Sequence, residues 1–241
     1  MPLHFLVDDA LTALPGDTVT LTGAEAHHAA VVRRVRTGET VTVGDGRGAW
    51  LTATVTSATP KAVDLHVESR RDTARPARRV VLVQALAKGD RDELAIQAAT
   101  ELGADEIVPW QASRSVSRWD AAKAAKGVAR WTSIVREASK QAHRDWVPEV
   151  ADPVSTAQLA RRSGTLLVLE PTAAEALSEV ELDDTGDIVL IVGPEGGISP
   201  DELTALTAAG ARSVRLGSTV LRTSTAGPAA LAVVSTRLGR W

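Results

Sequence analysis

Apolar and polar residues alternate along the first part of the chain, in short segments separated by turn residues. Valine or leucine alternates with threonine in the segments 17–22, 39–43 and 49–55, and with Asp64 and His66 in the segment 62–67. Such alternation is typical of strands with one face in a core and the other in water. A glycine-rich turn, 44–48, separates two of these strands. The pattern predicts a small antiparallel β-barrel.

One helical segment interrupts these strands, and we expect it to cover residues 23–36. It carries two histidines and three arginines: His27, His28, Arg33, Arg34 and Arg36. The residues alone leave two interpretations open, a solvated helix and a contact to RNA. After the last strand, the charged segment 70–79 is broken by a proline and is the best candidate for a linker. We therefore expect domains at 1–72 and 73–241.

Beyond residue 79, continuous apolar runs replace the alternation. We expect buried strands at 80–84, 106–109, 165–169, 188–192 and 213–216. Helical patterns cover 90–102, 119–143 and 225–238, and a further helix starts at 199. There Ser199 can cap the helix, with Pro200 and Glu202 in its first turn. Strands that alternate with helices predict an α/β domain with a mostly parallel sheet.

Three of these strands end in unusual loops. Ligands in open α/β sheets bind at such strand ends, and glycines let backbone N–H and C=O groups approach a ligand closely. A simple tight turn is the alternative for the glycine pair in the second loop. The candidate ligand-binding residues are Leu169, Glu170, Pro171, Val192, Gly193, Pro194, Glu195, Gly196, Gly197, Leu216, Gly217, Val220, Leu221 and Arg222.

Missing motifs narrow the chemistry of this site. The chain has neither Gly-x-Gly-x-x-Gly nor a Walker loop, so NAD or ATP held by its phosphates is disfavoured. It also lacks the Gly-x-Ser-x-Gly elbow of many serine hydrolases. The five histidines do not have the spacing of metal ligands, so we expect no metal.

Composition and charge add the compartment and a class of partner. No cysteine is present, which favours a reducing compartment, and no apolar run approaches the ~20 residues of a membrane span. We expect a soluble cytoplasmic protein. The net charge is −3, yet basic residues outnumber acidic ones eight to three between 111 and 146. A nearly neutral chain can therefore present a basic face to nucleic acid.

The loop residues resemble the C-terminal signature of the SPOUT methyltransferases, specifically the family that methylates N3 of a uridine in 16S ribosomal RNA. Further similarity covers nearly the whole chain. The residues that carry it are 193–197, 216–217, 220–223, Thr225, Ala226, 101–103, 107–109, 131–148, 169–171, His28, Val32, Arg33, Arg36 and Gly38. Each piece is weak by itself, whereas the combination is specific.

The resemblance implies an N-terminal PUA-like β-barrel and a C-terminal α/β domain with a deep trefoil knot, which general topology rules would not predict. It implies S-adenosylmethionine as the cofactor, bent and held by the three loops, and a homodimer formed through the knotted domain. The implied partner is 16S ribosomal RNA in the small ribosomal subunit. The family usually has glutamate where this chain has Ser224, so any role of that carboxylate is in doubt here.

The resemblance also suggests residue roles. Arg222 and Arg144 would stabilise the negative charge on the uridine, with Thr223 or Ser224 as further donors. Glu195 would accept a proton or the cofactor's amine, or form a structural ion pair with Arg222. We expect RNA contacts from Arg33, Arg34, Arg36, Arg114, Arg118, Lys123 and Arg130. The alternatives are an enzyme for another RNA or a ribose hydroxyl, and a non-catalytic RNA-binding protein.

Overall fold

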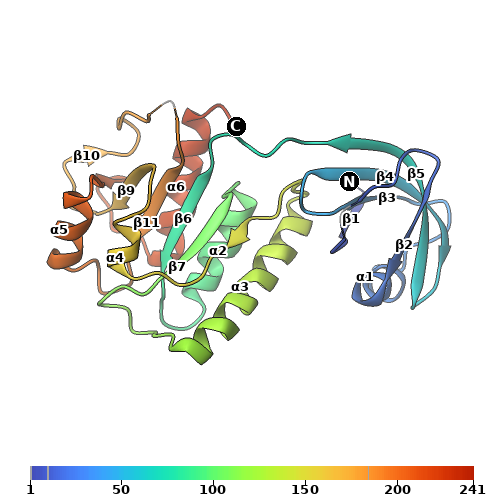
Figure 1. Ribbon diagram of the computed structural model, residues 1–241, viewed down its shortest axis with the longest axis horizontal. Helices are drawn as coiled ribbons and strands as arrows, with labels where there is room; N and C mark the ends of the chain where they lie inside the picture. The colour runs from blue at the N-terminus through green and yellow to red at the C-terminus, as the bar shows by residue number, and fades with distance from the viewer. Residues whose placement is uncertain (1, 10, 184) are drawn as a thin grey trace. The chain divides into compact units, whose positions relative to one another are not determined.

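The computed structural model describes residues 2–9, 11–183 and 185–241 of the chain and divides it into two compact units (Figure 1). Unit 1 comprises Met1–Arg75 and Ser139–Val147, and unit 2 comprises Pro76–Ala138 and Pro148–Trp241. Unit 1 thus takes a second segment from the middle of the chain. The domain limits expected from the sequence, 1–72 and 73–241, stay a prediction.

Unit 1 is built on a five-stranded mixed sheet. Its strands, in spatial order, are β1 (Leu3–Leu6), β3 (Thr40–Gly44), β4 (Ala49–Ala58), β5 (Ala62–Asp72) and β2 (Thr18–Thr22). β1 pairs with β3 in parallel and the other pairs are antiparallel, so the expectation of a wholly antiparallel barrel is wrong at this strand. The sequence pattern missed β1 because three of its four residues are buried, which leaves no alternation.

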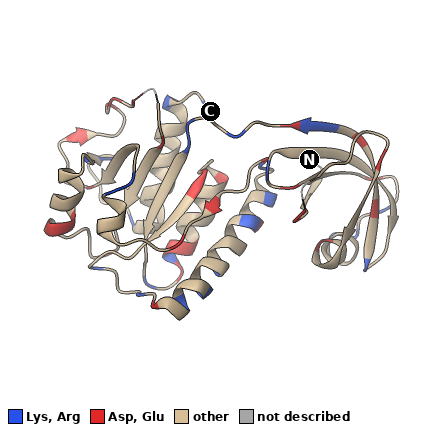
Figure 2. Cartoon of the chain, in the orientation of Figure 1, with Lys and Arg blue, Asp and Glu red and all other residues tan. Residues whose placement is uncertain are grey.

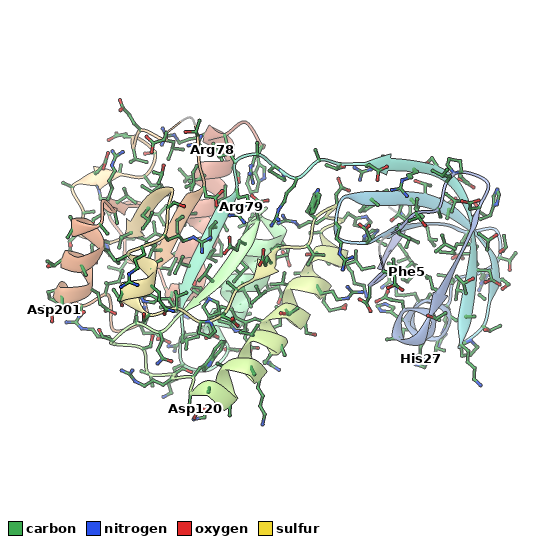
Figure 3. The ribbon with its side chains drawn as sticks, in the orientation of Figure 1. Phe5, His27, Arg78, Arg79, Asp120 and Asp201 are labelled. Atoms are coloured by element: carbon green, nitrogen blue, oxygen red, sulfur yellow. The ribbon has the colours of Figure 1, made fainter. Side chains whose placement is uncertain are left out.

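The predicted alternation places the core of unit 1. Valines and leucines of β2, β3, β4 and β5 point to one cluster with Phe5 of β1, which Figure 3 labels. The register between β4 and β5 shifts at Thr52/Ala53 and at Val55/Ser57. Such bulges bend and twist a strand pair, which helps a small sheet to wrap around its own core.

The helical segment of unit 1 is shorter than the sequence predicts. α1 (Gly23–His27) continues into one π-helical turn, η1 (His28–Val32), and ends there. The expectation of a helix to residue 36 is therefore wrong, and Arg33, Arg34 and Arg36 lie in the loop that follows. The buried side chain of Val35 belongs to the core cluster, and Arg34 has φ 56°. The chain therefore leaves the helical conformation where Val35 turns inward.

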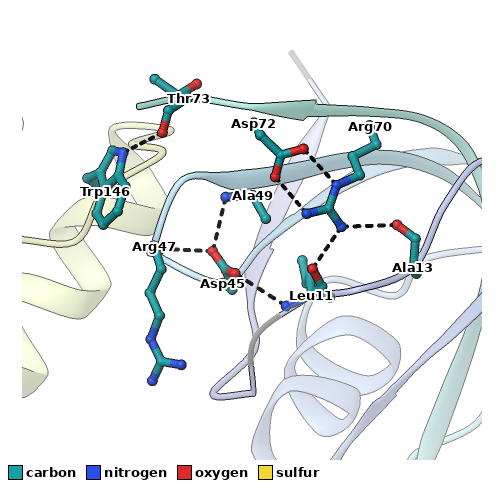
Figure 4. A network of polar contacts seen from close by, with 9 residues as sticks. All are labelled: Leu11, Ala13, Asp45, Arg47, Ala49, Arg70, Asp72, Thr73 and Trp146. Atoms are coloured by element: carbon teal, nitrogen blue, oxygen red, sulfur yellow. Dashed lines mark hydrogen bonds and ion pairs between the residues drawn. The ribbon is translucent and has the colours of Figure 1, made fainter. Parts of the chain in front are cut away.

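The expected linker is also wrong at its start, because β5 continues through Asp72 (Figure 4). Arg70 pairs with Asp72 at 2.6 Å and donates to the carbonyl oxygens of Leu11 at 2.7 Å and Ala13 at 3.2 Å. Arg70 therefore donates hydrogen bonds to backbone oxygens of the neighbouring loop, whereas the sequence pattern predicted a solvated linker residue.

The segment Ser139–Val147 is fixed to the sheet of unit 1 by polar contacts. Arg71 pairs with Asp145 at 2.6 Å, and the backbone N–H of Gly48 donates to the Asp145 carbonyl at 3.0 Å. Trp146 Nε1 donates to the Thr73 carbonyl oxygen at 2.8 Å, as Figure 4 shows. These contacts join residues more than seventy positions apart in the sequence.

Unit 2 contains a seven-stranded sheet in which every strand pair is parallel, which confirms the predicted α/β architecture. In spatial order the strands are β10 (Glu175–Ala176), β12 (Arg212–Arg215), β9 (Thr165–Leu169), β11 (Ile188–Val192), β6 (Val80–Ala85), β7 (Glu106–Trp110) and β8 (Glu149–Val150). β8 and β10 were missed because two residues carry no periodicity.

Helices cover both faces of this sheet (Figure 1). Leu159 of α4 (Thr156–Leu159) and Leu206 of α5 (Pro200–Ala208) share a core cluster with Val81 and Val83 of β6. Gly227 of α6 (Thr223–Arg237) lies against Leu82, whose side chain points to the opposite face, and α6 packs on α2 (Arg91–Glu101). The long basic helix α3 (Ala121–Gln141) follows β7. None of the helices in the described part of the chain is both long and apolar enough to span a membrane.

The register of unit 2 brings four strand ends together. Val192 pairs with Leu169 and with Gln84, and Leu169 pairs with Val214. β12, β9, β11 and β6 therefore finish at the same level of the sheet. The loops that follow them meet at this edge, where ligands of open α/β sheets bind.

Candidate functional site

A pocket of about 480 Å³ lies at these strand ends. Every candidate ligand-binding residue from the sequence lines it except Gly196. The lining residues outside that list of candidate ligand-binding residues are Arg91, Ile198, Val214, Arg215, Thr219, Thr223 and Ala226. The pocket is therefore formed by the three expected loops together with the start of α2 and the start of α6.

The glycine loop after β11 is both a tight turn and part of the pocket wall. The Gly197 N–H donates to the Pro194 carbonyl at 2.9 Å, and Gly197 has φ 72°, a conformation that favours glycine. A Cβ atom on Gly193 would lie 2.6 Å from Cγ1 of Ile198. A Cβ atom on Gly196 would lie 3.2 Å from Cβ of Arg114, so that glycine faces the loop after β7 and not the pocket.

Glu202 fixes the helix that follows the glycine loop. It forms the predicted capping box with Ser199, whose hydroxyl accepts from the Glu202 N–H. Glu202 also accepts from the Ser113 N–H at 2.8 Å, the Ser113 hydroxyl at 2.7 Å and the Thr156 hydroxyl at 2.8 Å. Burial raises the pKa of this carboxyl, but these donors outweigh burial and hold the pKa below its usual value. One buried carboxylate thus joins α5, α4 and the loop after β7.

Thr223 plays a similar part on the other side of the pocket. Its hydroxyl donates to the Gly193 carbonyl at 2.8 Å and accepts from Nε2 of Gln84 at 2.9 Å. The hydroxyl proton is therefore already used inside the protein, and the suggestion that Thr223 donates to a substrate is not supported. Ser224 follows on the first turn of α6, is half-buried, and is not among the lining residues.

Glu195 pairs with Arg91, so the suggested ion pair with Arg222 is wrong. Nη1 of Arg91 and the Lys88 N–H donate to Oε1 of Glu195 at 2.8 Å and 3.0 Å. Burial works against the charge of Glu195, yet its own backbone N–H, Arg91 and the Lys88 N–H together hold its pKa below the usual value. Glu195 is therefore an ionised acceptor at neutral pH and a poor proton acceptor. Arg91 could have been predicted as a residue of the site, because it starts α2 directly after β6, and β6 ends at the same edge of the sheet as β11.

The two candidate catalytic arginines lie in different units. Arg222 lines the pocket, is exposed, and has no side-chain hydrogen-bond or ion-pair partner among the described residues. It directly precedes α6, whose N-terminus adds positive potential there. Arg144 belongs to unit 1, where its Nε donates to the Trp146 carbonyl at 3.1 Å, and it is not among the lining residues.

The candidate RNA-binding residues fall into a free and an engaged group. In unit 1, Arg33, Arg34 and Arg36 are exposed and no partner is found for their side chains in the part of the chain described. In unit 2 the cations are engaged: Arg114 with Gly196 O at 3.2 Å, Arg118 with Ser113 O at 2.9 Å, Lys123 with Asp120 at 3.6 Å, and Arg130 with Glu93. Basic residues recur along α3, as Figure 2 shows. The two ion pairs among them, Lys123 with Asp120 and Arg130 with Glu93, are exposed on the side of the cation, and such pairs contribute little to stability.

Comparisons with known proteins agree with this fold. A family model described as an RNA methyltransferase domain matches residues 74–235, and one described as an RNA methyltransferase PUA domain matches residues 21–68. The fold and site thus define an RNA methyltransferase, and they confirm the predicted fold class of a SPOUT α/β unit with a PUA-like N-terminal unit.

Relatives narrow this class further. Ribosomal RNA small subunit methyltransferase E of Mycobacterium tuberculosis is 44% identical, over 94% of this chain and 89% of the relative. The protein of the same name from Bacillus subtilis is 33% identical, over 90% of each chain. A crystal structure of that methyltransferase from Neisseria gonorrhoeae, bound to S-adenosyl methionine, is 30% identical and covers 98% of both chains with a TM-score of 0.88. The chain belongs to the ribosomal RNA small subunit methyltransferase E family.

Proposed function

We propose that this protein transfers a methyl group from S-adenosylmethionine to N3 of a uridine in 16S ribosomal RNA, the family's uridine-1498. The observation that carries the proposal is the pocket at four level strand ends, where Arg222 lies in the wall without a side-chain partner among the described residues and the sequence has no phosphate-binding motif. The resemblance in the loop residues and the family membership support the same chemistry.

The pocket suits this cofactor in size and composition. Its volume of about 480 Å³ lies in the range of small-molecule sites. The glycine loop and the loop after β12 line the pocket, and backbone N–H and C=O groups are the donors and acceptors that an adenine ring needs. When bound, S-adenosylmethionine supplies an electrophilic methyl group on its sulfonium. The protein then has to hold the uridine in line with that methyl group and stabilise the charge of the base.

We assign the charge stabilisation to Arg222. The N3–H of uridine is a weak acid, so negative charge develops on O2 and O4 of the base as N3 reacts. A cation without a side-chain partner among the described residues, such as Arg222, can donate to such an oxygen without first breaking an ion pair. Arg144 stays a second candidate for this role. Glu195 is assigned to cofactor binding, because its low pKa makes it a poor base.

The same proposal covers the partners. Arg33, Arg34 and Arg36 of unit 1 contact RNA phosphates, and Arg114, Arg118, Lys123 and Arg130 contribute from unit 2. The substrate is the RNA within the small ribosomal subunit, in the cytoplasm. The enzyme acts as a homodimer formed through unit 2, which the resemblance expects to be knotted.

Two experiments test the proposed reaction. Calorimetry with S-adenosylmethionine is expected to show binding, and no binding at millimolar cofactor would leave only the non-catalytic RNA-binding alternative. In 16S ribosomal RNA from cells that lack the protein, mass spectrometry of nucleosides is expected to show loss of one N3-methyluridine. Loss of a ribose methyl group, or of a methyl group on another base, would assign the enzyme to the other RNA-modifying alternatives.

The loop after η1 gives a prediction for RNA binding. Replacing Arg33, Arg34 and Arg36 together by glutamine is expected to weaken binding to 16S RNA and to make the plot of log K against log salt less steep by about 2. The reason is that binding releases fewer counterions from the RNA when the protein makes fewer phosphate contacts. Fluorescence anisotropy over a series of salt concentrations measures the slope.

The matched control replaces the same three arginines by lysine, which keeps the charges. We expect that variant to retain the wild-type salt dependence. An unchanged slope in the glutamine variant would show that this loop does not lie on the RNA.

A further inference from the structure

An ion pair stands in the wall of the pocket, between the start of α2 and the loop after β11. Nη1 of Arg91 lies 2.8 Å from Oε1 of Glu195, and both residues line the pocket. Their side chains are 49% and 25% exposed, so neither is shut away in the core. The pair joins two elements that meet only because β6 and β11 are neighbours in the sheet.

Each partner of this pair keeps unused hydrogen-bonding capacity. Arg91 Nη1 and the Lys88 N–H both donate to Oε1 of Glu195, and no other residue of the described ranges donates to Oε2. The guanidinium of Arg91 has further N–H donors, which likewise have no partner in the described ranges. Unused donors of Arg91 and an oxygen of Glu195 that accepts from no other described residue thus stand side by side in one wall.

The other charged residues of the pocket are less suited to take a second ligand group. Arg215 already donates to the carbonyl oxygens of Ala173 and Ala174, and Oε1 of Glu170 accepts from the N–H and the hydroxyl of Thr172. Arg222 forms no ion pair with an acid among the described residues, so it offers only one sign of charge. Only the pair of Arg91 and Glu195, among the described lining residues, offers both signs of charge at one place.

We infer that Arg91 and Glu195 bind the amino-acid end of the cofactor, with Arg91 holding its α-carboxylate and Oε2 of Glu195 holding its α-ammonium. The inference rests on the proposed function, because it needs a ligand with a zwitterionic end. The carboxylate and the ammonium of such a ligand can each pair with the opposite charge in the protein, and the net charge of the site does not change. Since the pair already exists, little rearrangement is needed on binding. Arginine suits a carboxylate because its planar N–H groups can donate two parallel hydrogen bonds.

Calorimetry with two ligands that differ only in this end tests the inference. S-adenosylhomocysteine carries the amino-acid group, whereas 5′-methylthioadenosine has the same nucleoside and sulfur atom without it. Arg91→Ala is expected to weaken S-adenosylhomocysteine binding at least ~10-fold. The same variant is expected to change 5′-methylthioadenosine binding by less than about twofold, because that ligand does not reach the pair. Glu195→Gln is expected to show the same selectivity, and Arg91→Lys a smaller loss.

Two comparisons keep the outcomes apart. Arg161→Ala removes an exposed arginine of unit 2 outside the pocket and is expected to leave both affinities unchanged. Equal weakening of both ligands in Arg91→Ala and Glu195→Gln would overturn the inference, as would unchanged binding of S-adenosylhomocysteine. If the wild-type protein bound S-adenosylmethionine but did not prefer S-adenosylhomocysteine over 5′-methylthioadenosine, the inference would fail while the proposed function stood. If it bound none of the three, the proposed function itself would fail.

Discussion

Replacing Arg222 with alanine is expected to lower the rate of methyl transfer at least ~10-fold, with little change in the affinity for S-adenosylmethionine. Arg222 lines the pocket without a side-chain partner among the described residues, so its charge is available to the uridine and is not needed for the fold. Single-turnover transfer of labelled methyl groups to 16S RNA measures the rate, and calorimetry measures the affinity.

Arg222→Lys provides the comparison for charge without the planar group, and we expect an intermediate rate. Unchanged transfer in Arg222→Ala would show that Arg222 does not act on the base. A loss of cofactor affinity as large as the loss of rate would place Arg222 on the cofactor instead. Arg144→Ala in the same assay tests the second candidate independently.

Replacing Glu202 with alanine is expected to destabilise unit 2 by about 3 kcal/mol. The carboxylate is 7% exposed and accepts hydrogen bonds from Ser113, Thr156 and Ser199. Without it, partly buried hydrogen bonds from three segments lose their acceptor. Urea unfolding followed by tryptophan fluorescence measures the change. Asp201→Asn, on the same turn but exposed, removes an equal charge and is expected to change stability by less than about 1 kcal/mol.

The contribution of Glu202 should also depend on pH. Its pKa in the folded protein lies below the unfolded value of about 4.3, so the native state favours the charged form. The stability that it contributes is therefore fully present above pH ~4.3 and is lost as the pH falls through the folded pKa. The difference in unfolding free energy between wild type and Glu202→Gln should shrink over that window. A difference that stayed constant from neutral to acid pH would contradict a role for the charge.

Local patterns sufficed for the elements whose signal is local. Alternation located the strands of unit 1, buried apolar runs located the main strands of unit 2, and glycines at strand ends located the pocket loops. Elements such as β8 and β10 have two residues each, too few to show a period. The end of the helix near Val32 was missed because it depends on the burial of Val35 in the core, which the local sequence pattern does not show.

Side-chain partners at the site could not be predicted in the same way. That Glu195 meets Arg91, rather than Arg222, depends on the order of strands in the sheet, because β11 neighbours β6 there. Likewise, Glu202 was predicted as a capping residue from its spacing to Ser199, whereas its contacts with Ser113 and Thr156 link separate elements. Spacing along the chain predicts the contact with Ser199, whereas the contacts with Ser113 and Thr156 depend on tertiary packing.

The split composition of unit 1 has a consequence for synthesis of the chain on the ribosome. Residues up to Arg75 emerge first, but Asp145 and Trp146, the partners of Arg71 and Thr73, belong to the segment that ends at Val147. At ordinary translation speeds, this segment follows about 4 to 14 s later. Until this segment is synthesised, the β-rich part of unit 1 lacks the contacts that the segment supplies, and the surface that it covers is exposed. For the same reason, a recombination event that moved only the first 75 residues to another gene would leave behind the partners of Arg71 and Thr73.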